Sequence, residues 1–158
     1  MSDGSARTLW RISNFSDLRG SGGQWTPSRW SFAGHRVVFM AESPAGAMLE
    51  ILVHLPFEDG ELPDTYQLMS IQAPEGVNVK ELHPPRRADW RTKIEITQRI
   101  GTAWLVSGET PLARVPSAIM PRTSNYLLNP AHPDASSVVI HEIIRERFDD
   151  RLFRLGAH

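Results

Sequence analysis

The chain has 158 residues, with 17 Lys and Arg against 18 Asp and Glu, and it contains no cysteine. This length predicts one compact domain, and the lack of cysteine excludes disulfides, thiolate zinc sites, iron–sulfur clusters and a cysteine nucleophile. A formal net charge of −1 argues against direct nucleic-acid binding, because that affinity comes from neutralising phosphates. A few arginines can still converge on one small phosphate-bearing ligand.

No stretch of the sequence has the pattern of a signal peptide or of a membrane-spanning helix. Asp3 interrupts the start, and the longest apolar run, residues 37–41, is far shorter than the ~20 residues that a spanning helix needs. We therefore expect a cytoplasmic protein of bacterial type that does not associate with membranes.

The hydrophobic pattern predicts short strands and two helices. Strands are expected at 8–12, 37–41, 66–73, 115–120, 126–128 and 138–147, and helices from 44 to about 54 or 55 and from 92 to 107. Ser43 is the expected N-cap of the first helix and Pro56 its stop, and Gly108 should end the second helix. Because strands and helices do not alternate strictly, we expect the α+β class, as a single compact domain with a mixed β core and flanking helices.

The first predicted helix carries one carboxylate among apolar residues. Apolar side chains surround nearly the whole helix, which indicates burial, and only Gly46, Glu50 and His54 interrupt them, at i, i+4 and i+8. Because burying an isolated carboxylate is costly, Glu50 should face a partner charge or a hydrated cavity. Two interpretations stay open: a Glu50–His54 pair on a narrow solvated strip, or a functional cleft with Glu50 as the main candidate.

Two arginines next to tryptophans precede this helix, Arg11 after Trp10 and Arg29 before Trp30. The guanidinium fork holds phosphate oxygens in a bidentate manner, so the two could bind a diphosphate. The alternative is that each is a surface arginine lying over a tryptophan. Phe39 and Trp30 could stack on a flat ring, or they could belong to the core.

Several common catalytic motifs are absent. The sequence has no GxGxxG, no GxxxxGK[ST] and no GxSxG, which leaves no sign of a doubly wound dinucleotide fold, a P-loop or a nucleophile elbow. The six histidines show no metal-ligand spacing, and His132 lies in a predicted turn, so no metal site is expected. Ser117 has no adjacent base, which argues against a serine nucleophile but not against a hydroxyl that lines a pocket.

Taken in order, these segments resemble the RES-domain family, the toxin half of RES–Xre toxin–antitoxin pairs. The family's Leu/Tyr-x-Arg opening matches residues 9–11, and its Val-Val-Tyr-Ala-x-Ser-Pro-x-x-Ala-x-Leu-Glu block matches residues 37–50. Further matches are 27–34, 98–105, 115–119, 125–133 and 150–153. The resemblance predicts a RES domain over residues 8–153, between a flexible start (1–7) and a tail (154–158).

The resemblance implies a fold like that of ADP-ribosyltransferases and the consumption of NAD, as substrate rather than cofactor, by hydrolysis or phosphorolysis of the nicotinamide–ribose bond. It assigns catalysis to Arg11, Arg29, Glu50 and Ser117, and NAD binding to the same residues together with Phe39. Glu50 would stabilise positive charge on the ribose, the two arginines would hold the diphosphate, and Ser117 would bind an amide or hydroxyl.

Where this chain departs from the family, Phe39 replaces a tyrosine, Ser31 an asparagine, and Pro27-Ser28 the glycines before Arg29. We expect Phe39 to keep its packing on nicotinamide and the activity to be lowered rather than lost. The glycine-rich segment 20–24 is expected to close over the ligand and exclude water.

The resemblance also implies a cognate Xre-type helix-turn-helix antitoxin that covers the active site, and it leaves room for a homodimer. Two other functions stay open. One is ADP-ribosyl transfer onto a macromolecule at the same site, and the other is a non-catalytic domain that binds NAD.

Overall fold

The computed structural model describes residues 5–55 and 62–154. The strands are β1 (Arg7–Ile12), β2 (Val38–Ala41), β3 (Thr65–Ala73), β4 (Val79–Glu81), β5 (Leu112–Pro116), β6 (Ser124–Leu128) and β7 (Val139–Arg147). The α-helices are α1 (Pro44–Leu52) and α2 (Ile94–Ser107), and short 3₁₀ helices span Ser21–Gln24, Pro133–Ser137 and Asp150–Arg154.

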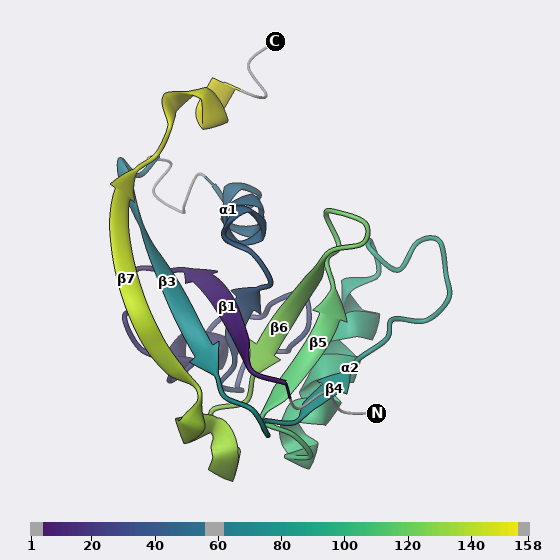
Figure 1. Ribbon diagram of the computed structural model, residues 1–158. Helices are drawn as coiled ribbons and strands as arrows, with labels where there is room; N and C mark the ends of the chain where they lie inside the picture. The colour runs from purple at the N-terminus through teal and green to yellow at the C-terminus, as the bar shows by residue number, and fades with distance from the viewer. Residues whose placement is uncertain (1–4, 56–61, 155–158) are drawn as a thin grey trace.

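Within these residues the strands form one seven-stranded mixed sheet in the order β4-β5-β6-β2-β1-β3-β7 (Figure 1). β4 and β5 are parallel and the other neighbours are antiparallel. The predicted α+β class and single domain are confirmed.

The two predicted helices form, and their caps are those expected from the sequence. The Ser43 hydroxyl accepts a hydrogen bond from the Gly46 N–H at 2.9 Å, and Gly108 ends α2 with a φ of 62°, a left-handed conformation that favours glycine. α1 ends at Leu52, earlier than predicted, because the His54 N–H bonds the Ile51 carbonyl in a tightened last turn. The proposed stop, Pro56, lies outside the described residues.

The predicted strand at 115–120 is wrong in its second half. β5 ends at Pro116, and the Ser117 hydroxyl then accepts the backbone N–H groups of Ile119 and Met120 at 3.1 and 3.2 Å. A serine that satisfies nearby backbone donors in this way competes with strand pairing. The chain therefore turns at Ser117 into the β5–β6 hairpin.

The predicted full burial of α1 is also wrong. Ala47 is the buried residue of this helix, and Val53 just beyond it is 53% exposed. The helix packs mainly against β1 and β2, beside the sheet in Figure 1. An apolar pattern on every face therefore did not mean that every face is covered, and this leaves Glu50 within reach of solvent.

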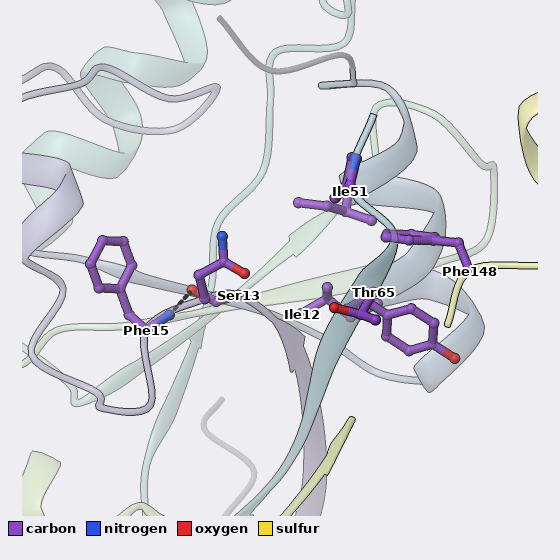
Figure 2. Close-up of a pocket in the computed structure, with 9 residues that line it drawn as sticks. Ile12, Ser13, Phe15, Ile51, Thr65 and Phe148 are labelled. Atoms are coloured by element: carbon purple, nitrogen blue, oxygen red, sulfur yellow. Dashed lines mark hydrogen bonds between the residues drawn. The ribbon is translucent and has the colours of Figure 1, made fainter. Parts of the chain in front are cut away.

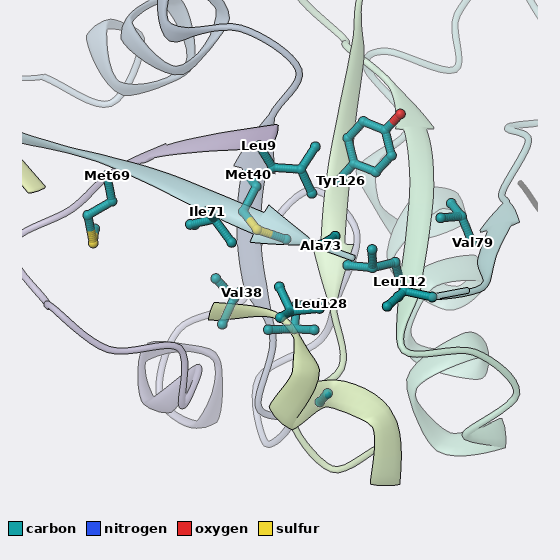
Figure 3. Close-up of a cluster of buried hydrophobic side chains, with 13 residues drawn as sticks. Leu9, Val38, Met40, Met69, Ile71, Ala73, Val79, Leu112, Tyr126 and Leu128 are labelled. Carbon is teal, nitrogen blue, oxygen red and sulfur yellow. The ribbon is translucent and has the colours of Figure 1, made fainter. Parts of the chain in front are cut away.

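The core consists of two clusters on opposite faces of the sheet. Side chains alternate between faces along a strand, so Leu112 and Leu128 join one cluster while Ala113 and Leu127 join the other. The first cluster combines side chains from β1 through β6 on one face of the sheet (Figure 3). The second packs α2 against β5 and β6 and includes the tryptophans Trp30, Trp90 and Trp104.

The sheet is weakly joined between β1 and β2. These strands share a single residue pair, Trp10 with Ala41, whereas β1 and β3 share six and β2 and β6 share four. The carboxyl end of β1 follows β3 and departs from β6 (Figure 1). The sheet thus splits into a β4-β5-β6-β2 part and a β1-β3-β7 part.

Candidate functional site

A cavity of about 790 Å³ lies where the sheet splits. Its walls come from β1, β2, α1, residues 26–30 and the β5–β6 hairpin. Four of the five residues singled out from the sequence line this cavity, namely Arg11, Arg29, Phe39 and Glu50. The fold therefore brings together side chains that are up to 39 positions apart in the chain (from 11 to 50).

Glu50 presents a partly fixed carboxylate to the cavity. Its Oε1 accepts hydrogen bonds from the Ser117 hydroxyl at 3.0 Å and from the Asn125 amide nitrogen at 2.8 Å. Among the described residues, Glu50 and His54 form no hydrogen bond or ion pair with each other. Of the two interpretations left open by the sequence, the structure favours the cleft over the Glu50–His54 pair.

Ser117 lies behind Glu50 rather than on the cavity wall. It is 2% exposed, and its hydroxyl donates to Glu50 while it accepts from the backbone N–H groups of Ile119 and Met120. The serine thus orients the carboxylate, and its predicted direct contact with substrate remains a prediction.

Arg11 bridges the split between β1 and β2. Its Nη1 donates to the Phe39 carbonyl and its Nη2 to the Ser13 hydroxyl, both at 3.2 Å, so it satisfies a β2 carbonyl that the diverging strands leave unpaired. Burial lowers the pKa of Arg11, and the charge of Asp17 partly opposes this effect. Since arginine stays protonated at neutral pH, the cavity wall carries a positive charge shielded from water, which attracts anions strongly.

Arg29 is held by α2 and by the segment that precedes this helix. Its Nη1 donates to the Arg91 carbonyl at 2.8 Å, and its own carbonyl accepts from the buried Thr97 hydroxyl. The Gln98 amide nitrogen donates to the Ser28 carbonyl at 2.9 Å. Consecutive residues of α2 therefore fix the backbone on both sides of Arg29 and leave its side chain at the cavity.

The neighbouring tryptophan belongs to the core. Trp30 is 3% exposed, and its ring lies 6.4 Å from that of Trp90. Trp30 and Phe39 both contribute to the cavity wall, but Phe39 is half-buried and therefore exposes more of its ring. Of the two aromatic residues considered for stacking on a flat ring, Phe39 is the one whose ring is available.

The glycine-rich segment is an anchored turn rather than a lid. Gly20 has a φ of 68°, and its carbonyl accepts the Val37 N–H. A side chain on Gly23 would place its Cβ 2.3 Å from the His35 carbonyl oxygen. None of residues 20–24 lines the cavity, so the predicted closure over a ligand does not fit this structure.

Sequence reasoning missed the role of Asn125. The residue lies in a segment that matches the family, but no function was assigned to it. A signal was present, because Asn125 is a polar residue in the strand that leads to the buried Tyr126, Leu127 and Leu128. A strand pattern alone did not reveal that its side chain meets Glu50 of α1.

A smaller pocket of about 200 Å³ adjoins the cavity and shares Ile12, Ser13 and Ile51 with it (Figure 2). Its aromatic lining comes from Phe15, Tyr66 and Phe148. None of the described residues that line this pocket is charged. A charged group of a ligand would therefore be bound in the larger cavity, where the arginines are.

The described residues also bear on metal binding and on membrane association. Across residues 5–55 and 62–154, no group of three or more His, Asp or Glu side chains is arranged to hold a metal ion. In the same part of the chain, no helix has the length and apolar character needed to cross a membrane.

The α+β fold has a precedent among solved structures. The chain is similar to a chain in the crystal structure of the M. tuberculosis MbcT–MbcA toxin–antitoxin complex, with a TM-score of 0.74 and 15% identity over 99% of this chain and 92% of the other. At this identity the likeness establishes the fold. The family model of the RES domain matches residues 8–151, and the chain belongs to the RES domain family.

Curated relatives place the chain among the toxins of this family. A protein of Pseudomonas putida named Toxin Res is 45% identical over 147 residues, which cover 92% of this chain and 99% of that protein. The Prs ADP-ribosylating toxin of Sphingobium sp. strain YBL2 is 34% identical over 158 residues, which cover 93% and 97%. The predicted membership of the RES-domain family is confirmed.

Proposed function

We propose that this RES-domain toxin cleaves the nicotinamide–ribose bond of NAD. The main supporting observation is that Glu50 lines a cavity of about 790 Å³ and that two hydrogen-bond donors hold its Oε1. The cavity exceeds the roughly 300 Å³ of a small ligand pocket and has room for a dinucleotide. A positioned carboxylate and a half-buried arginine in one cavity suit a substrate that combines a developing cation with phosphates.

In this reaction the bond between the ribose C1′ and the nicotinamide nitrogen breaks, and its electron pair goes to that nitrogen. Nicotinamide leaves as a neutral molecule, so no strong general acid is needed. Positive charge develops on the ribose, and the Glu50 carboxylate stabilises it. A water oxygen then bonds to C1′ and loses a proton, which yields ADP-ribose. Alternatively, an anionic oxygen of inorganic phosphate bonds to C1′ without loss of a proton, which yields ADP-ribose 1-phosphate.

The remaining side chains hold the substrate. Arg11 and Arg29 bind the diphosphate from the two sides of the cavity and fix the reacting carbon near Glu50. Phe39 packs on the nicotinamide ring, and Ser117 acts through Glu50. NAD is the substrate, and no metal or further cofactor takes part in these steps.

A second candidate is ADP-ribosyl transfer onto a protein, in which a side chain of the target replaces water or phosphate as the nucleophile. The Sphingobium relative, named an ADP-ribosylating toxin, favours this alternative. A non-catalytic domain that only binds NAD is the third. All three use the same cavity, and they differ in the fate of the ADP-ribose.

Incubation of the purified chain with NAD, with and without phosphate, separates these functions. We expect free nicotinamide together with ADP-ribose or its 1-phosphate, and a loss of about 100-fold or more for Glu50→Gln, which keeps the shape but removes the charge. If NAD labelled in its ADP-ribose part is added to a cell extract and the label appears on a protein, the reaction is ADP-ribosyl transfer. If NAD stays intact after prolonged incubation and the wild type and Glu50→Gln are equally toxic, the hypothesis of enzymatic NAD cleavage is wrong.

We further propose that an antitoxin of the Xre type covers this cavity in the cytoplasm. The support is the family resemblance and the fold shared with a chain of a toxin–antitoxin complex. Where the adjacent reading frame encodes a helix-turn-helix protein, co-expression with it should yield a copurifying complex that no longer releases nicotinamide. Size-exclusion chromatography of the chain alone would show whether it forms a homodimer.

A further inference from the structure

Asn125 lies in the middle of the sheet and faces the carboxylate. It pairs with Ala41 of β2 on one side and with Val115 of β5 on the other, and its side chain lines the cavity. Its Nδ2 donates to Glu50 Oε1 at 2.8 Å. Since a carboxylate offers only acceptors, this contact determines which amide atom is the nitrogen.

The other amide atom, Oδ1, is buried and has no hydrogen-bond donor among the residues that the structure describes. A buried carbonyl oxygen without a donor lowers stability. Rotating the amide by half a turn would set this oxygen against Glu50 Oε1, with two acceptors facing each other. The orientation of Asn125 thus serves Glu50 and leaves its own acceptor unsatisfied.

A second buried asparagine next to the same strand shows that this arrangement is not imposed by the strand. Asn129 is 3% exposed. Its Nδ2 donates to the Leu105 carbonyl and its Oδ1 accepts from the Ala131 N–H, both at 3.1 Å. Asn129 is therefore satisfied at both atoms, as a purely structural asparagine should be, whereas Asn125 is satisfied only toward the carboxylate.

We propose that Asn125 is a positioning residue for Glu50. If the Ser117 hydroxyl were the sole donor, the Glu50 carboxylate could rotate about this one hydrogen bond. A second donor on the same oxygen sets the plane of the carboxylate and directs Oε2 toward the ribose. This role rests on the proposed cleavage of NAD.

The test compares Asn125→Ala with Asn125→Asp in the purified full chain, with kcat and KM for nicotinamide release as readouts. We expect kcat of Asn125→Ala to fall about 10- to 100-fold with KM nearly unchanged. Asn125→Asp should be less active still, because it places a second carboxylate against Glu50. A packing role predicts the reverse order, since Asp has nearly the shape of Asn. If the alanine variant does not fold, Asn125→Ser, which retains a donor, should exceed Asn125→Asp.

Asn129→Ala is the matched control. It should lower the melting temperature and leave kcat near the wild-type value. If the wild type cleaves NAD but Asn125→Ala stays within threefold of it, or if Asn125→Asp equals or exceeds Asn125→Ala, the positioning role is overturned and the proposed function stands. A wild type that leaves NAD intact overturns both.

Discussion

Arg11 and Arg29 carry the same charge to one cavity, but their surroundings differ. Arg11 is shielded from water, and its guanidinium supplies the Phe39 carbonyl with the donor that β1 does not provide. Arg29 reaches the cavity from a loop and bonds one carbonyl, that of Arg91. Arg11 therefore has a structural role as well as the proposed binding role, whereas the structural role of the Arg29 side chain is small.

This difference predicts different effects of the two alanine substitutions. Arg29→Ala should raise KM for NAD about 10-fold, the loss of one charge-assisted hydrogen bond, and shift the melting temperature by no more than about 2 °C. Arg11→Ala should raise KM at least as much. It should also lower the free energy of unfolding by about 1–3 kcal/mol, because the Phe39 carbonyl loses its donor.

Steady-state kinetics and thermal unfolding of both variants check this prediction. Arg11→Lys is the informative companion, since it keeps the charge but not the fork that reaches both Phe39 and Ser13. Equal losses of melting temperature for both alanine variants, without any effect on NAD, would leave the two arginines with structural roles alone.

At the scale of elements, α2 determines where residues 28–32 lie. Its Thr97 and Gln98 side chains bond the carbonyls of Arg29 and Ser28, and the Thr102 hydroxyl accepts the Phe32 N–H at 3.0 Å. Gly101 allows this approach, because a Cβ there would lie 1.8 Å from the Trp30 carbonyl oxygen. The helix thus supports the cavity without lining it.

Gly101→Ala should therefore disturb both stability and substrate binding. The clash is with backbone and cannot be relieved by a rotamer change, so we expect a loss of about 2 kcal/mol or more, or ~4–8 °C in melting temperature, and a higher KM for NAD. Gly22→Ala is the control, since its Cβ would have no neighbour within 4 Å. A Gly101→Ala variant as stable as Gly22→Ala would contradict the close packing of α2 on Trp30.

The sequence predicted the helices and most strands better than it predicted how they pair and which of their faces are buried. Local signals sufficed for the helix caps at Ser43 and Gly108, because a cap depends on neighbouring residues. The three-residue strand β4 escaped notice, since it pairs with β5 some 30 positions away and carries little pattern of its own. The burial of α1 was misjudged because periodicity shows which faces are apolar and not which are covered.

The site was predictable to a similar extent and for a similar reason. Arg11, Arg29, Phe39 and Glu50 were found from motifs in order, and the fold brings them to one cavity. The contacts behind them were not found, since the Ser117 and Asn125 donors reach Glu50 across 67 and 75 positions of sequence. A glycine-rich segment suggested mobility, whereas its tight contacts with residues 34–37 hold it in place.

At the scale of the molecule, the cavity spans the two parts of the split sheet. Arg11 belongs to the β1-β3-β7 part, and Phe39 belongs to the other part. One residue pair joins the ladder between them, and the Arg11 side chain adds a hydrogen bond across the same gap. A ligand held by residues of both parts would add contacts across the weakest junction of the sheet.

NAD should consequently stabilise the whole fold, and Glu50→Gln makes this measurable because the variant should bind NAD but cleave it at least about 100-fold more slowly. At an NAD concentration of about 100 times Kd, binding adds ~2.7 kcal/mol to the free energy of unfolding. For a chain of this size that corresponds to a rise of about 5–11 °C in melting temperature. Arg11→Ala in the Glu50→Gln background should show about half that rise or less at the same NAD concentration, because a Kd raised about 10-fold leaves only ~1.4 kcal/mol of stabilisation. Equal rises in the two proteins would place NAD outside the split, and no rise in either would mean that the cavity does not bind NAD.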